Sequence, residues 1–386
     1  GAYSKKLTLD AYRSTVDHPM STKYRNSGAV NYMTSHLETE MKGAKLANTF
    51  DVSNHEITAG LDMSKRNWDG RYYRTNVSTG VTTPLNKSID DVDTINKAIF
   101  AKDKIKVNDA LTVELGARYD DTQIERAGVK TKDFNDLSGY ALGTYNVDKT
   151  LKVFAGAGRS NRVPDAKELY FTRNNGTVIG NANLDNVTNN EIDLGFEKKF
   201  ANFDLKSKLF YSKLDNFIAY NDTSKTYENV DASLYGIEMS GSWYATEKLT
   251  IDAGLAYQRG TKDDPLTGQT DTNLPDIPPF KAIIGATYNY SDTLKLEGQL
   301  IAAAPWTQID DANGEQKLDG YNVVNLKATK DLGSGLELSV GIDNLFDSTY
   351  AISNSYKDLT LLTGTEDTMV LNEPGRYFYT QLKYKF

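Results

Sequence analysis

Histidine and methionine are concentrated near the start of the chain. All three histidines and four of the six methionines lie within residues 18–63. Thioether sulfur is a soft ligand that selects Cu(I), and imidazole binds copper and other late transition metals. Four of these side chains are close enough in sequence to act together, and they are the candidate metal ligands: His18, Met20, Met33 and His36.

The four candidate ligands flank one polar segment, 19–36, which we expect to be a loop between two extended segments. His18 and Met20 stand at its beginning, and Met33 and His36 at its end, so both pairs meet if the ends of the loop lie side by side. The alternative is that the histidines are ordinary solvated side chains and the methionines fill a loop or strand. His55 lies in a predicted tight turn and is not included in the site.

The rest of the chain offers little further chemistry. There is no cysteine, which excludes disulfides, thiol catalysis and thiolate-ligated metals. Three carboxylate pairs, Asp120–Asp121, Asp263–Asp264 and Asp310–Asp311, could bind a hard cation such as Ca²⁺, but none has EF-hand spacing. No catalytic triad order or phosphate-binding loop is present, so neither an enzyme nor a resident cofactor is expected. The net charge of −8, without a basic run, gives no indication of a nucleic-acid partner.

The last ten residues form a segment with two chemically different faces. Phe378, Leu382, Tyr384 and Phe386 alternate with polar side chains and with Tyr379. Because side chains alternate along a strand, one face of this segment is apolar and the other largely polar. An apolar outer face, a polar inner face and a C-terminal aromatic residue are typical of a transmembrane β-barrel, whose outer face contacts lipid.

Composition agrees with membrane-spanning strands and excludes membrane-spanning helices. Only 39% of the 386 residues are hydrophobic, and no long apolar run is present. The 24 tyrosines suit the headgroup boundary, since the ring is apolar and the hydroxyl requires water. A soluble all-β protein rich in tyrosine remains the alternative at this point.

Connection lengths distinguish the two alternatives. Alternating segments recur along the chain, and we count about sixteen strands in an antiparallel up-and-down order. Short turns on one rim and long loops on the other are typical of bacterial outer-membrane barrels. The tight turns are expected near 52–54, 108–109, 148–149, 201–202, 246–247, 291–292 and 333–334. The long connections are expected at about 19–36, 66–93, 121–135, 160–190, 220–235, 259–279, 305–320 and 347–372.

A series of motifs after residue 150 indicates a particular kind of barrel. Each is weak alone, but in this order they resemble the C-terminal half of the TonB-dependent receptors, which import scarce metal chelates and vitamins. The motifs are 151–170 (LKVFAGAGRSNRVPDAKELY), 180–184 (GNANL), 190–197 (NEIDLGFE), 210–218 (FYSKLDNFI), 275–279 (PDIPP), 341–350 (GIDNLFDSTY) and 373–376 (EPGR).

The resemblance implies a domain organisation and partners. Residues 1–386 would be a partial outer-membrane β-barrel domain, with about sixteen of the 22 strands of a plugged transporter barrel. The N-terminal plug domain, the TonB contact segment and the first strands have no counterpart in the sequence, and the residues after 184 depart from the family's usual pattern. The implied location is the bacterial outer membrane. The implied partners are lipid, a TonB complex acting through the plug, and a metal or metal-chelate ligand.

The resemblance also bears on the transported ligand. Residues 16–20 (VDHPM), with Met33, look like the Asp-His-x-Met segment of the copper-receptor branch. Met20 and Met33 would then be the barrel's sulfur ligands, and the plug would supply the others. Copper uptake is therefore the favoured function, with copper as bound cargo. A ferric-siderophore receptor, a porin-like passive channel and a structural or adhesive barrel remain alternatives.

Overall fold

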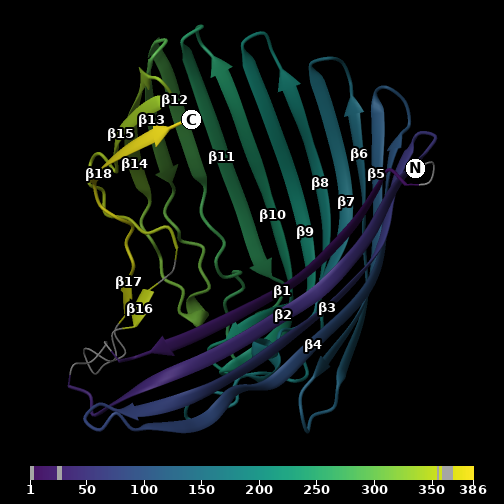
Figure 1. The fold of residues 1–386 in the computed structure, drawn as a ribbon, viewed down its shortest axis with the longest axis vertical. Helices are drawn as coiled ribbons and strands as arrows, with labels where there is room; N and C mark the ends of the chain where they lie inside the picture. The colour runs from purple at the N-terminus through teal and green to yellow at the C-terminus, as the bar shows by residue number, and fades with distance from the viewer. Residues whose placement is uncertain (1–3, 24–27, 354–355, 359–367) are drawn as a thin grey trace.

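A computed structural model describes residues 4–23, 28–353, 356–358 and 368–386. Sixteen strands form one antiparallel sheet in chain order (Figure 1). They are β1 (Lys6–Ser21), β2 (Asn31–Val52), β3 (His55–Asn76), β4 (Thr82–Lys106), β5 (Leu111–Glu125), β6 (Lys132–Asn146), β7 (Leu151–Arg162), β8 (Val187–Lys199), β9 (Phe203–Asn221), β10 (Thr226–Tyr244), β11 (Leu249–Lys262), β12 (Lys281–Ser291), β13 (Leu294–Ala303), β14 (Tyr321–Gly333), β15 (Leu336–Asp343) and β18 (Tyr377–Tyr384).

The remaining elements are short. They are α1 (Ala166–Tyr170), the 3-10 turn η1 (Asp311–Asn313), and a separate two-stranded sheet of β16 (Tyr356–Asp358) and β17 (Thr368–Val370). Within the described residues, β1 and β18 are the two edges of the large sheet, which curves without closing on itself. No helix in this part of the chain is long and apolar enough to cross a membrane.

The predicted all-β, antiparallel up-and-down fold is confirmed, and so is each of the seven predicted tight turns. Several predicted long connections are instead extensions of the strands. β3 continues to Asn76 and β4 begins at Thr82, so most of segment 66–93 is strand. The polar composition of that segment misled the prediction, because a strand that rises beyond the lipid is polar on both faces. Part of the last predicted connection, 347–372, lies outside the described residues.

The sheet has an apolar outer face and a polar inner face. Leu46, Leu61, Ile99, Tyr119 and Leu137 pair in register across β2–β6, and all five are exposed on the outer face. The residues next to these on each strand face inward and also pair in register. This inner row is mostly polar: Lys45, Asp62, Ala98, Asp120 and Asp136. This arrangement is expected when lipid surrounds the wall and water or protein fills the lumen.

The connection between β7 and β8 folds back and forms a small core. Asp165 caps α1 by accepting a hydrogen bond from the Glu168 backbone N–H, while the Glu168 carboxylate accepts one from the Asp165 N–H. This capping box fixes a helix of a single turn, whose Leu169 and Tyr170 are buried against Ile89 and other strand residues. Trp68 and Phe171 are among the partly buried side chains that pack on this core.

A second packed region joins the connections after β11 and β13. The Lys262 Nζ donates to the Asp310 Oδ1 at 2.9 Å, and neither side chain is exposed to solvent. Asp310 also accepts a hydrogen bond from Asn313 Nδ2, and its own N–H donates to Glu315. Burial raises the pKa of the Glu315 carboxyl, although backbone N–H groups of Asp310 and Asp276 donate to it. These connections are therefore held by a buried polar network.

Candidate ligand site in the barrel lumen

The four predicted metal ligands lie on the extended parts of β1 and β2. The structure continues β1 to Ser21 and begins β2 at Asn31, so His18, Met20, Met33 and His36 are strand residues and do not lie in a loop. Met20 pairs with Ser35, and the Thr22 backbone N–H donates to the Met33 carbonyl at 2.9 Å. The ladder therefore fixes which side of the sheet each of them faces.

Three of the four share the lumenal face. His18 pairs with Leu37, which packs on the buried core inside the barrel, so His18 faces the lumen. Met20 lies two residues after His18 on β1 and therefore faces the same way. Thr22 follows two residues later, and Met33, its neighbour on β2, lies on this face as well. Side chains at diagonal positions on one face of a ladder lie about 7–8 Å apart at Cβ, which two long thioethers can bridge. The structure thus brings Met20 and Met33 together, and His18 lies on the same face two residues before Met20.

The fourth residue, His36, faces the outside of the barrel. It pairs with Pro19, the residue before Met20, and adjacent residues on a strand face opposite sides of the sheet. Its Nε2 lies 2.5 Å from Asp17 Oδ1 and 3.7 Å from Glu38 Oε1. Since the sheet separates it from the methionines, His36 does not share a site with them.

Met20 and Met33 line one cavity of about 540 Å³ at the extracellular end of the lumen. Its other walls are largely apolar and aromatic, with Trp68, Tyr72 and Phe171 among them, and Lys167 supplies a positive charge. Met20 is 45% exposed, so this residue is accessible from the lumen. Such a cavity can hold a soft cation on sulfur.

Tyr170 stands beside this cavity, on the helix next to Phe171. Burial raises the pKa of the Tyr170 hydroxyl, and the Arg126 guanidinium lies 5.3 Å from the centre of its ring. The proximity of this cation partly opposes the effect of burial. The hydroxyl is therefore neutral at physiological pH.

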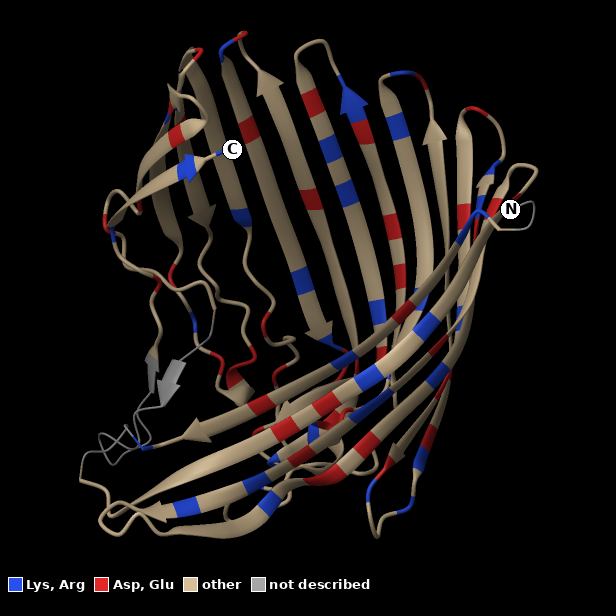
Figure 2. Cartoon of the chain, viewed as in Figure 1, with Lys and Arg blue, Asp and Glu red and all other residues tan. Residues whose placement is uncertain are grey.

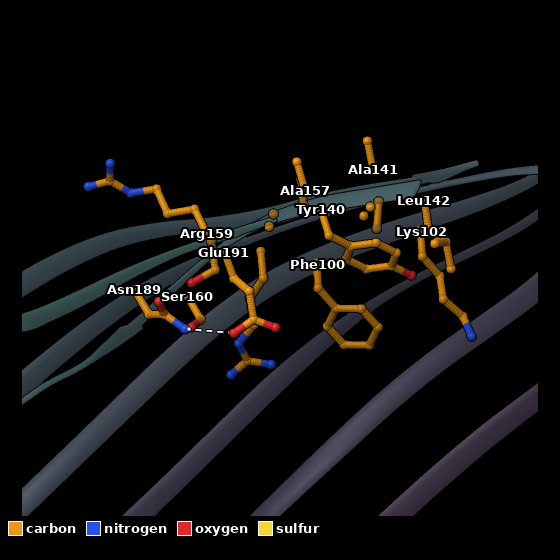
Figure 3. A pocket seen from close by; sticks show the side chains of 18 of the residues that line it. Phe100, Lys102, Tyr140, Ala141, Leu142, Ala157, Arg159, Ser160, Asn189 and Glu191 are labelled. Atoms are coloured by element: carbon orange, nitrogen blue, oxygen red, sulfur yellow. Dashed lines mark hydrogen bonds between the residues drawn. The ribbon is translucent and has the colours of Figure 1, made fainter. Parts of the chain in front are cut away.

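A second cavity of about 900 Å³ lies lower on the lumenal wall of β2–β8. Figure 3 shows Phe100, Tyr140 and Glu191 on one side of the sheet and Ala141, Ala157 and Arg159 on the other. The Phe100 and Tyr140 rings lie over inward-facing glycines, where a Cβ atom would collide with them. This cavity was not predicted from the sequence, although inward glycines paired with aromatic residues on neighbouring strands were a usable signal.

Arg118 is one of the charged residues that line the second cavity. The Arg118 guanidinium donates to Asp120 at 2.8 Å and to Asp62 at 3.1 Å. Both carboxylates come from the inner row described above: Asp120 lies two residues from the arginine on β5, and Asp62 lies on β3. This wall therefore offers a preorganised cation and acceptor groups to whatever occupies the lumen.

The three carboxylate pairs considered for Ca²⁺ have other partners. Asp120 accepts hydrogen bonds from Arg118, Asp263 pairs with Lys213, and Asp310 pairs with Lys262. In the described part of the chain, Asp17, His36 and Glu38 are the one group of three or more histidine, cysteine and carboxylate side chains whose ligand atoms could meet on one ion.

Comparison with known proteins agrees with this architecture. Residues 2–345 match the family described as "TonB dependent receptor-like, beta-barrel". The vitamin B12 transporter BtuB of Photobacterium profundum is 29% identical over 365 residues, which cover 89% of this chain and 51% of that protein. The heme transporter BhuA of Brucella suis biovar 1 is 23% identical over 366 residues, covering 91% and 52%.

Solved structures show the same fold. The copper transporter OprC superposes with a TM-score of 0.87 at 21% identity, covering 100% of this chain and 65% of OprC. The ferric citrate transporter FecA superposes with a TM-score of 0.76 at 16% identity, covering 98% and 59%. The chain spans about half the length of the curated relatives that it matches. With its sixteen-stranded wall and a family match over most of its length, this chain belongs to the TonB-dependent receptor β-barrel family of the bacterial outer membrane.

Proposed function

We propose that this barrel takes part in TonB-dependent uptake of copper across the outer membrane. The observation that carries the proposal is the placement of Met20 and Met33 in one lumenal cavity, with His18 on the same face. Two thioethers and an imidazole form a donor set that favours Cu(I) over harder ions. The copper transporter OprC, which has the same fold, supports this choice of cargo.

The barrel's part in uptake is capture. Copper arriving from outside first meets the extracellular ends of β1 and β2, where Met20 is accessible. A plug domain in the lumen would complete the coordination, and energy relayed by TonB would release the ion inward. The relatives are named as transporters and receptors, which supports a role without catalysis for this chain.

A ferric-siderophore receptor is the second candidate. Arginine and aromatic side chains also gather at the extracellular end of the lumen, where Arg173 donates to the Tyr220 hydroxyl at 2.8 Å. The Tyr220 and Tyr227 rings form an edge-to-face pair with centroids 5.3 Å apart. Such groups suit a large anionic chelate, since guanidinium binds its charge and the rings cover its apolar parts.

Copper retention by a double variant tests the first proposal. Met20→Ala plus Met33→Ala removes both sulfurs from the cavity, whereas Met41→Ala plus Met63→Ala removes two methionines that do not line it. Each variant, purified in detergent in the full form that its gene encodes, is loaded with Cu(I) under reducing conditions, washed and analysed for metal. We expect loss of bound copper in the first variant only. Equal retention in both variants would remove the site.

Ferric chelates and conductance distinguish the alternatives. Saturable binding of a ferric siderophore, weakened by Arg173→Ala and unaffected by loss of the two methionines, would favour the second candidate. Steady ion conductance of the complete protein in a planar bilayer would favour a passive channel. Transport of copper into cells that depends on TonB supports the proposed uptake.

A further inference from the structure

The outer face of β1 and β2 carries a second group of metal-binding side chains, separate from the methionine cavity. Asp17 comes from β1, and His36 and Glu38 come from β2 two positions apart, so all three point away from the lumen. Their ligand atoms all lie within 4.8 Å of one another. From this geometry we propose that Asp17, His36 and Glu38 bind a divalent transition-metal ion of borderline softness, such as Zn²⁺, on the outer surface of the barrel.

The site lies above the lipid. On β1 the outer positions are apolar at Leu9 and Ala11 and polar from Arg13 to Asp17, which follows six residues after Ala11. At about 3.3 Å per residue this is roughly 20 Å further along the strand. On β2 the outer apolar positions end with Leu46 and Ala44, and Lys42 and Glu40 stand between them and Glu38. Ions in the surrounding water therefore reach the site directly.

The strand register supplies a separate reason for a cation. Asp17 pairs directly with Glu38, and Glu38 pairs directly with Asp69 of β3, which places three carboxylates in one row. Like charges directly opposite each other destabilise a sheet. Asp69 is compensated by Lys87 at 2.8 Å. In the described residues, neither Asp17 nor Glu38 forms an ion pair with a lysine or arginine; His36 is their shared partner.

The distances need little adjustment for a metal. Ligand atoms about 2.0–2.2 Å from a tetrahedral Zn²⁺ are separated from one another by roughly 3.3 Å. The His36 Nε2 to Glu38 Oε1 distance of 3.7 Å is close to this value, and the 2.5 Å to Asp17 Oδ1 is too short by about 1 Å. The Asp17 side chain is 68% exposed and can rotate outward. One nitrogen and two carboxylate oxygens leave a fourth position for water.

His55 provides a matched control within the same chain. It also faces outward, and its Nδ1 lies 2.6 Å from Asp103 Oδ2, but in the described residues no second carboxylate completes a group of three. A histidine and one carboxylate are therefore common to both places. The second carboxylate is the difference on which the proposal depends.

Zinc titration of the complete protein in detergent tests the site. Competition with a chromophoric zinc chelator is measured for the parent protein, His36→Ala, Asp17→Asn, Glu38→Gln and His55→Ala. Because even the outer-shell partners of metal ligands affect affinity by about 10–100-fold, loss of His36 should weaken the tightest zinc site by at least about tenfold. Asp17→Asn and Glu38→Gln should weaken it as well, and His55→Ala should leave it unchanged.

Two further measurements make the result decisive. Zinc X-ray absorption should show one imidazole and oxygen ligands in the parent protein, and the imidazole signal should be lost in His36→Ala. The Met20→Ala plus Met33→Ala variant should keep its zinc affinity, so this test is independent of the copper proposal. Unchanged zinc affinity in folded His36→Ala, or an equal loss in His55→Ala, overturns the proposal.

Discussion

Replacing Lys262 by methionine should open the packed connections on the extracellular side. Lys262 and Asp310 are both fully buried, and 2.9 Å separates the ammonium from the carboxylate. Methionine keeps most of the length of the lysine side chain and removes its charge. The Asp310 carboxylate would then be buried with Asn313 Nδ2, at 2.7 Å, as its remaining side-chain donor.

The expected effect is large because the substitution leaves a buried charge without its counter-ion. Removing one partner of a buried ion pair destabilises by about 3–5 kcal/mol. Since 1.4 kcal/mol corresponds to a factor of ten, local opening should become about two to three and a half orders of magnitude more frequent. The effect should be confined to residues 263–280 and 304–320, because the membrane-spanning strands keep their ladders.

Hydrogen exchange followed by mass spectrometry measures this opening peptide by peptide. The control is Lys225→Met, which breaks the Lys225–Asp222 pair at 2.7 Å. Those two side chains are 51% and 47% exposed, so the loss should be below about 1 kcal/mol. A third variant, Lys262→Met plus Asp310→Leu, replaces both buried charges with apolar groups and should recover most of the lost protection.

One outcome refutes the reasoning. If Lys262→Met exchanges as slowly as Lys225→Met in 263–280 and 304–320, the buried pair does not hold these connections together. Faster exchange that extends equally over the strand peptides would show instead that the whole barrel has been destabilised.

Three further predictions concern the connections. Asn344 is buried at φ 51°, and its side chain donates to and accepts from the Ser348 backbone. Asn344→Ala should therefore lower the free energy of unfolding, measured by urea titration, by about 2–3 kcal/mol. Asn344→Gly should lower it less, because glycine tolerates that φ; equal losses would contradict the role of φ. Asp165→Ala removes the cap of α1 and should destabilise the helix by about 1 kcal/mol. The fluorescence emission of Trp68 should change as well, because Trp68 packs on the same core. Unchanged emission and stability would show that the cap is dispensable. The raised pKa of Glu315 means that the folded state holds this proton more tightly than the unfolded state. Its contribution to stability is therefore fully present below the unfolded pKa and is lost as pH rises through the folded pKa. Hydrogen exchange in 304–320, corrected for the intrinsic exchange rate, should become faster as pH rises above about 4.3. Glu315→Gln should flatten this trend.

The wall of the barrel could be predicted from the sequence because its signals are local. Turns such as 148–149 and the alternation of residues 111–119 depend on neighbouring residues, and the structure places both as expected. The height of β3 and β4 could not be predicted in the same way. Above the lipid both faces of a strand meet polar surroundings, so alternation fades while the hydrogen-bond ladder continues.

The candidate site was only partly predictable, for a geometric reason. In a loop the direction of a side chain is not fixed by its position, so the expected loop at 19–36 allowed His36 to meet Met33. In the observed strand, residues three apart face opposite sides, and the two are separated by the sheet. The buried Lys262–Asp310 pair joins residues 48 positions apart and carries no local pattern.

The unequal strand lengths give the barrel an oblique mouth. β4 has 25 residues and β15 has 8, which correspond to lengths of about 80 Å and 26 Å. Since about 9–11 tilted residues cross the bilayer, more than half of β4 stands outside it. The charged surface of β1–β4 therefore rises on one side of the opening (Figure 2). Molecules that approach from that side meet the charged strands first, whereas next to β12–β15 the wall is continued by the packed connections 263–280 and 304–320.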